Sequence, residues 1–182
     1  MRKEHIFMAG DHTTGVPSRA AIAGHPIHPA LIPFPIAFLI GALATDLGYW
    51  WTADPFWARV SLWLVGAGLV TGALAAVFGL IDFVTIGRAR EHTAGWIHAL
   101  GNGAALALAL VSLLLRLGDE AAAVLPWGLI LSALTTVTLA VTGYTGGELA
   151  YRHMIGVTGH GGEESDTDHA HQPAGHKHHH AA

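Results

Sequence analysis

The chain contains 182 residues, of which 52% are apolar and only 12% are charged, and its formal net charge is −4 with neutral histidines. Soluble domains carry about a quarter charged residues, so this composition leaves too little polar surface for a soluble fold. Cysteine is absent, which excludes disulfides, cysteine catalysis, thiolate-bound iron–sulfur clusters and covalent c-type haem, and the acidic balance without a basic stripe excludes a nucleic-acid partner.

Residues 1–23 form a polar N-terminal segment without a continuous apolar core, so we expect no cleaved signal peptide. The stretch GHPIHPALIPFP at 24–35 follows, in which His25 and His28 each precede a proline. The residue before a proline avoids the helical region, so we expect both histidines in an extended or turn conformation. His28, which is nearer the apolar run, is predicted to point into the protein and His25 to lie at the membrane interface. In the alternative, both imidazoles only anchor this lead-in segment among the lipid headgroups.

Four long apolar runs come next, at 30–51, 57–83, 93–116 and 124–150. A bilayer core of about 30 Å needs roughly 20 helical residues, and each run is at least that long. Backbone groups in lipid must bond within their own segment, so the runs are predicted to be helices. Short connections join the first two and the last two runs. This predicts an all-α membrane protein whose residues 24–157 form a four-transmembrane-helix, up-down-up-down bundle.

The basic residues favour one orientation of this bundle. Four spans put both termini and the middle loop 84–92 on the same side, and that side carries seven Lys or Arg residues against two on the other. We therefore expect both termini to be cytoplasmic, in a bacterial inner membrane. The two basic residues assigned to the outer side are Arg59 and Arg116.

Each span also carries small or hydroxyl residues at a spacing of three or four, such as Gly68, Gly72 and Gly79 in the second run. Small residues let membrane helices approach closely, so tight packing is the simplest interpretation of these stripes. The alternative is that the glycines make room for a flat cofactor between helices.

Polar residues gather toward the cytoplasmic ends of the spans, and Asp46 is the exception, predicted near the outer surface. Ionisable groups within a membrane are costly, so their default interpretation is functional and inward-facing. The sequence therefore predicts one cytoplasmic-side polar pocket built from all four helices. The candidate ligands of a haem or metal ion are His28, His98, His153 and His25, and the candidates for holding these ligands or relaying protons are Asp82, Asn102, Glu148 and Arg88.

His98 is the best single ligand candidate because it lies well inside a span, with Asn102 one turn further along the same face. A buried neutral imidazole needs its ring N–H satisfied, and a metal on the other nitrogen fits that pattern. In the alternative, His98 is a packed histidine that is hydrogen-bonded across the bundle to Asp82 or Glu148.

The segment 158–182 is rich in glycine, histidine and acidic residues and is predicted to be disordered. Its histidines are candidates for weak binding of divalent metal ions, and the alternative is a solvated low-complexity tail. The histidines concerned are His169, His171, His176, His178, His179 and His180.

Several motifs together resemble the bacterial membrane family named domain of unknown function 2231. They are GHPIHPALIPFPIA at 24–37, GLIDF at 79–83, HALGN at 98–102 and GGELAYRHMIGV at 146–157. The resemblance implies a four-span inner-membrane domain that sometimes accompanies Rieske-type iron–sulfur modules. It thereby implies electron transfer and a redox partner, although this chain contains no such module.

Three functions remain open from the sequence. The first is a redox subunit that holds b-type haem or a divalent metal at the cytoplasmic side, and the second is a transporter or channel for protons or metal ions. The third is a non-catalytic scaffold in which the polar residues only tie the helices together. In each case we expect the lipid bilayer as the partner and no independent catalytic activity, and a homo-oligomer is compatible with all three.

Overall fold

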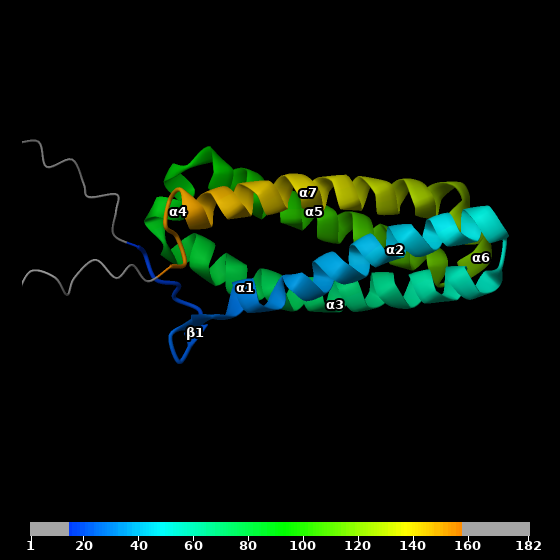
Figure 1. The fold of residues 1–182 in the computed structure, drawn as a ribbon, viewed down its shortest axis with the longest axis horizontal. Coiled ribbons are helices and arrows are strands. Elements are labelled where there is room, and N and C mark those ends of the chain that lie inside the picture. Colours follow the sequence, from blue (N-terminus) through cyan, green and yellow to red (C-terminus); the bar gives the residue numbers. More distant parts are fainter. Residues whose placement is uncertain (1–14, 158–182) are drawn as a thin grey trace, which may run out of the picture.

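The computed structural model of the chain describes residues 15–157 (Figure 1). The predictions for the first residues and for the histidine-rich tail lie outside this range. Within it, the chain forms a helical bundle with both described ends at the same end of the long axis. We call this end, which carries the N- and C-terminal segments, the terminal end, and the opposite one the loop end.

The chain enters the bundle through a small hairpin. Strands β1 (Ala21–Ile22) and β2 (His25–Pro26) pair antiparallel across a two-residue turn with positive φ angles, 49° at Ala23 and 79° at Gly24. Such turns favour glycine because it has no Cβ. Helix α1 (Ile27–Leu31) follows directly.

The extended conformation predicted for His25 is confirmed, whereas the one predicted for His28 is wrong, because His28 lies in α1. The proline after it, Pro29, sits in the first turn of that helix. A proline is tolerated there because the N–H groups of a first turn have no partner within the helix.

Four helical segments are long and apolar enough to cross a membrane within residues 15–157, which confirms the predicted fold class. The first combines α1 with α2 (Pro33–Thr52), and the second is α3 (Pro55–Thr85). The short helix α4 (Gly87–Glu91) leads to the third, α5 (Thr93–Arg116). The fourth combines α6 (Glu120–Ala123), the π-helical turn η1 (Val124–Gly128) and α7 (Leu129–Tyr151).

The segments pack as two hairpins. Helix α2 packs along α3, and α5 packs along α7, while α3 contacts α5 and α2 contacts α7 where the hairpins meet. The two hairpins diverge toward the terminal end (Figure 1). This is the up-down-up-down arrangement that the short connections predicted.

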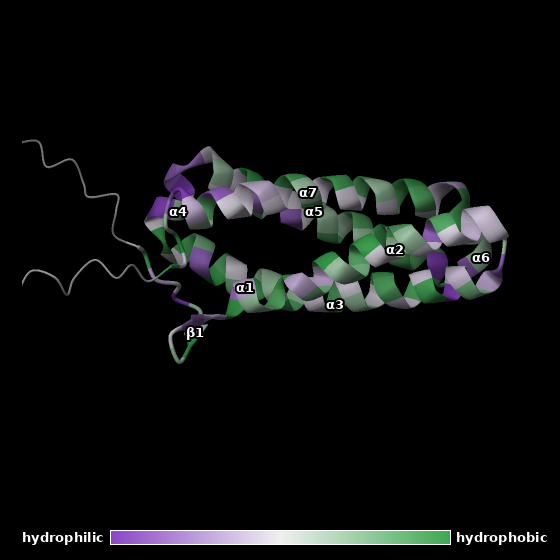
Figure 2. Cartoon of the chain, viewed as in Figure 1, coloured by the Kyte–Doolittle hydropathy of each residue, from purple (hydrophilic) through white to green (hydrophobic). Residues whose placement is uncertain are grey.

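Burial in this bundle is the reverse of that in a soluble protein. The buried apolar residues are mostly small, as at Ala58 and Ala75, and Leu39, Ala105, Ala109 and Leu139 form an apolar layer at mid-bundle. Large apolar side chains instead face outward along the helices, where they contact the lipid bilayer. Figure 2 shows hydrophobic residues along the length of the bundle and hydrophilic ones gathered toward its two ends.

Candidate functional site

A cavity of about 610 Å³ lies between the two hairpins, in the half of the bundle nearer the terminal end. All four spans contribute to its walls, which are mostly apolar side chains and glycines. Among the polar residues predicted for one pocket, four line this cavity together with Thr142: they are His28 on α1, Asp82 on α3, and His98 and Asn102 on α5.

His28 and His98 face each other across the cavity. Their ring centroids are 5.9 Å apart, and the ring planes are nearly perpendicular, at 86°. His28 Nδ1 lies 2.8 Å from the backbone oxygen of Ala75 on α3, and His98 Nδ1 lies 2.8 Å from that of Thr142 on α7. A carbonyl oxygen can only accept, so both rings donate from Nδ1, and a neutral ring then keeps a lone pair on Nε2.

Two glycines allow the rings to sit this close to the neighbouring helices. A Cβ atom on Gly79 would lie 2.8 Å from His28 Nδ1, and one on Gly146 would lie 2.7 Å from His98 Cε1. Either contact is shorter than a methyl group tolerates. These two glycines therefore make room for imidazoles. Gly68 instead packs against a leucine side chain, as predicted if the small residues serve tight packing of the helices.

Asn102 connects His98 to the fourth span. Its side-chain amide donates to the His98 backbone oxygen at 2.8 Å and lies 3.3 Å from His98 Nε2. Its Oδ1 accepts a bond of 3.2 Å from the Thr142 hydroxyl. The alternative in which His98 bonds to Asp82 or Glu148 is therefore wrong about the partner, which is the α7 backbone.

Asp82 holds the N-terminal segment over the terminal end of the cavity. Its carboxylate accepts bonds from the Ser18 hydroxyl at 2.6 Å and from the backbone N–H groups of Arg19 and Ala20 at 2.7 and 3.0 Å. Ser18 itself lines the cavity. In the same segment, the Val16 N–H donates to the Met154 oxygen at 2.8 Å, so the N- and C-terminal segments are joined at this end.

The structure does not bring the remaining predicted residues to the cavity. His25 is exposed, with its Nδ1 3.0 Å from the Ala23 oxygen, and Arg88 lies on α4 outside the cavity lining. Glu148 instead forms an ion pair of 3.1 Å with Arg152, which directly follows the last residue of the same helix.

His153 stacks on His92 outside the cavity, with ring centroids 3.7 Å apart and an angle of 24° between the planes. Desolvation of its ring lowers the pKa of His153 below the ordinary 6.5, and the nearby His92 lowers it further. Both effects favour the neutral ring of His153. Within residues 15–157, no group of three or more His, Asp or Glu side chains could hold a metal ion.

A second polar cluster, near the loop end, was missed by the sequence analysis. Asp46, predicted near the outer surface, and Arg116, assigned to the outer side, are both fully buried and form an ion pair of 2.7 Å. The guanidinium binds both carboxylate oxygens, at 3.0 and 2.7 Å, and Ser61 and Ser132 each donate a bond of 2.6 Å to one of those oxygens. Ser112 accepts a bond of 3.2 Å from Arg116 Nε, so the cluster is fully hydrogen-bonded.

A sequence signal for this pair did exist. Arg116 follows Ala105, Ala109 and Ser112 on the buried stripe of α5 at helical spacing, and Asp46 continues the buried stripe of α2 in the same way. The apolar layer around Leu39 and Leu139 lies between the two polar clusters.

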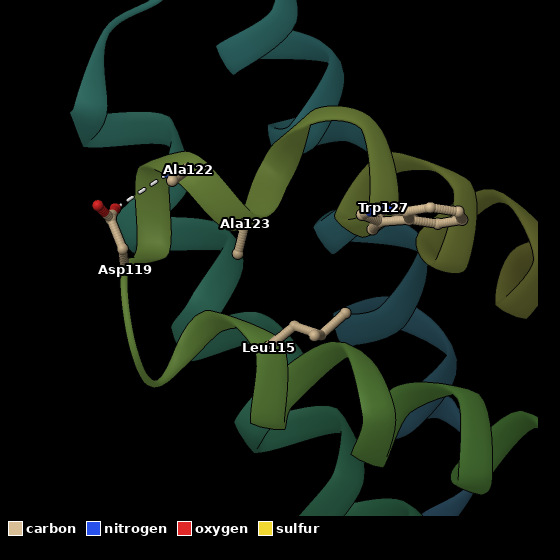
Figure 3. Close-up of a pocket in the computed structure, with 5 residues that line it drawn as sticks. All are labelled: Leu115, Asp119, Ala122, Ala123 and Trp127. Atoms are coloured by element: carbon tan, nitrogen blue, oxygen red, sulfur yellow. Dashed lines mark hydrogen bonds between the residues drawn. The ribbon is translucent and has the colours of Figure 1, made fainter.

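A shallower pocket of about 240 Å³ lies at the loop end (Figure 3). Its one ionisable residue, Asp119, caps the short helix α6 by accepting bonds from the N–H groups of Ala121 and Ala122 at 3.1 and 3.0 Å. In Figure 3 this carboxylate points away from Trp127 on the other side of the pocket. The capping role accounts for Asp119, and we assign no site here.

Comparison with known proteins places the chain in a family but assigns it no activity. No curated protein and no solved structure matches it. A family model described as a predicted membrane protein matches residues 24–159, which include all four spans and the facing histidines. The chain therefore belongs to the membrane protein family of the domain of unknown function 2231.

Proposed function

We propose that this protein is a membrane-embedded redox subunit that binds one b-type haem between its two hairpins, with His28 and His98 as the axial ligands. The observation that carries the proposal is the pair of facing imidazoles. Their Nδ1 atoms are engaged by backbone carbonyls, so a ligand would bind at Nε2, where His98 has a long 3.3 Å contact with the Asn102 amide.

The separation of the rings is compatible with one metal atom between them. Two metal–nitrogen bonds of roughly 2 Å, with about 1.1 Å from each nitrogen to its ring centre, put trans imidazoles about 6 Å apart. The centroids of His28 and His98 are 5.9 Å apart. His98 would exchange its long 3.3 Å contact with Asn102 for the metal bond, while Asn102 keeps its bond to the backbone.

The number of ligands favours haem over a bare metal ion. A structural or catalytic zinc ion takes three or four protein ligands, whereas haem brings four nitrogens of its own and needs at most two from the protein. Among the described residues, the cavity offers two facing imidazoles but no group of three His, Asp or Glu side chains that could hold a metal ion. Its mostly apolar, glycine-containing walls also suit a flat, apolar macrocycle better than a hydrated ion.

When bound, haem would supply one-electron transfer. The chain's own residues would hold and orient the ligands. The backbone oxygens of Ala75 and Thr142 fix the tautomer and orientation of the two rings, and such bonds raise the basicity of a ligating imidazole. Asp82 and the N-terminal segment would limit the access of water at the terminal end.

Neither alternative is favoured by a specific observation. An ion path would have to cross the apolar layer that separates the cavity from the Asp46–Arg116 pair. A scaffold accounts for the hydrogen bonds of His98 with Thr142 and Asn102. A scaffold gives no role to the Nε2 atom of His28, which forms no hydrogen bond with any described residue.

We also propose a bacterial inner-membrane location with both termini in the cytoplasm. The basic residues support it, because seven Lys or Arg residues are assigned to the side of the termini and only two, Arg59 and Arg116, to the other side. The family resemblance favours a Rieske-type protein as the electron partner. A C-terminal fluorescent protein that matures only in the cytoplasm tests the orientation, and absence of fluorescence from a fully expressed fusion would contradict it.

The haem proposal is tested by the absorption spectrum of the full chain, purified in detergent from haem-replete cells. We expect a Soret band and a haemochrome that reports one b-type haem per chain. His28→Ala and His98→Ala should each abolish six-coordinate binding, whereas His25→Ala and His153→Ala, which change histidines outside the cavity, should not. A colourless, metal-free preparation would refute the proposal, as would a haem spectrum that His28→Ala leaves unchanged.

A further inference from the structure

We infer that the domain consists of two equivalent hairpins, related by an approximate two-fold rotation. We also infer that the Asp46–Arg116 pair makes the hairpin that carries Asp46 pack against the hairpin that carries Arg116, and not against a second copy of itself. The first hairpin runs from Ile27 to Thr85 and the second from Thr93 to Tyr151. This inference does not depend on haem binding.

The first helices of the two hairpins repeat at an interval of 70 residues. His28 and His98 are separated by this interval, and so are Asp46 and Arg116. Each pair meets across the centre of the bundle. Four of the five buried positions in each helix follow the same interval: Pro35, Leu39, Ala42 and Asp46 on α2, and Ala105, Ala109, Ser112 and Arg116 on α5.

The second helices repeat as well, at an interval of 67 residues, from Ala75 to Thr142 and from Gly79 to Gly146. His28 bonds to the backbone of Ala75 and lies against Gly79, while His98 bonds to the backbone of Thr142 and lies against Gly146. The glycine follows the carbonyl by four residues in both hairpins. The contacts between the hairpins have the same symmetry. The rotation exchanges the contact of α2 with α7 for the contact of α5 with α3, and both contacts are present.

The equivalence is broken where the charges are buried. Positions 46 and 116 are equivalent, yet one carries a carboxylate and the other a guanidinium, both with no exposed side-chain surface. Two first hairpins packed together would bury two carboxylates there, and two second hairpins would bury two guanidinium groups. A buried charge without an opposite partner is strongly destabilising, and two like charges are worse.

The inner face of each hairpin therefore fits a hairpin that carries the opposite charge at this position. Within one chain, that partner is the other hairpin. Between two copies of the chain, the first hairpin of one copy could pack against the second hairpin of the other, whereas two first hairpins or two second hairpins could not pack together. The pair thus acts on the choice of partner, in addition to any effect on stability.

A charge exchange in the full chain tests this inference. Asp46→Arg and Arg116→Asp, made singly, bury two like charges and should raise the unfolding equilibrium constant by on the order of a hundredfold or more. The double variant D46R/R116D restores an opposite pair at equivalent positions and should be clearly more stable than either single variant. The measurement is the unfolding midpoint in detergent. If the single variants cannot be purified, the measurement is the amount of protease-resistant chain in isolated membranes.

The exposed ion pair of Arg59 and Glu120 provides a matched control, since it also joins the two hairpins, at 3.0 Å, but with an Arg side chain that is 69% exposed. Arg59→Glu should leave the midpoint nearly unchanged because exposed pairs contribute little. The inference is overturned if D46R/R116D is no more stable than the single variants, or if Arg59→Glu is as damaging as Asp46→Arg. Both outcomes are independent of any haem spectrum.

Discussion

The contact between His98 and Gly146 yields the sharpest prediction from this structure. Replacing Gly146 by alanine places a methyl group 2.7 Å from His98 Cε1 and 2.9 Å from its Nδ1. The ring must then move away from α7, which lengthens its 2.8 Å bond to the Thr142 oxygen. The same substitution at Gly143, three residues earlier on the same helix, meets nothing within 4 Å and serves as the control.

The expected difference in stability between Gly146→Ala and Gly143→Ala follows from three contributions. Alanine in place of glycine within a helix stabilises it by about 0.5–1 kcal/mol, and both variants gain this. Overpacking in Gly146→Ala costs about 1–3 kcal/mol. The weakened hydrogen bond costs about 1 kcal/mol more. We therefore expect Gly146→Ala to be less stable than Gly143→Ala by about 2–4 kcal/mol.

The assay is equilibrium unfolding of the purified chain in mixed micelles with an increasing fraction of denaturing detergent, followed by circular dichroism. Gly79→Ala should behave like Gly146→Ala, since its Cβ would lie 2.8 Å from His28 Nδ1. If Gly146→Ala were as stable as Gly143→Ala, the His98 ring could not lie against Gly146. The reasoning about the orientation of the histidine pair would then fail.

Three further predictions concern charged and titratable residues. Arg116→Met leaves the buried carboxylate of Asp46 unpaired and should lower the free energy of unfolding by about 3–5 kcal/mol. Replacing both residues by apolar ones should restore much of the lost stability. Equal losses in the single and double variants would contradict this. Asp82→Ala removes the acceptor of three hydrogen bonds and should speed amide hydrogen exchange in the N-terminal segment, with the spans unchanged; exchange as slow as in the wild type would show that the segment is held by other contacts. Because the pKa of His153 is lowered, the folded state binds a proton at this ring less readily than the unfolded chain does. The stability that is present above pH 6.5 should therefore be lost as the pH falls through the folded-state pKa of His153. His153→Gln should reduce this loss between pH 7 and 5, and an unchanged pH profile would assign the effect to other groups. The charged groups that surround the stacked pair of His153 and His92 are Glu148, Arg152 and Arg88.

The spans could be predicted from the sequence because the signal for them is local. A run of about 20 apolar residues has few alternatives in a bilayer, since its backbone must bond within itself. The inward position of His28 was also predictable, from its place next to an apolar run. Its helical conformation was not, because the bias against helix before a proline is weak in a first turn.

Partners across the bundle could not be predicted in the same way. Asp82, Glu148 and His153 all lie near the terminal end, but only Asp82 reaches the cavity, and there it binds the backbone of the N-terminal segment. Depth in the membrane follows from residue number, whereas the direction of a side chain depends on the rotation of each helix about its axis. That rotation is set by packing against the other three helices.

The sequence by itself determined the membrane location, the four spans and their alternating direction, because these depend on hydropathy and length alone. Only the tertiary structure decided that Asp46 and Arg116 neutralise each other in the interior and that His28 and His98 meet across one cavity. The members of each pair are 70 residues apart. Such contacts form only when both hairpins have packed, and the small residues between them let the helices come close enough for the polar groups to pair.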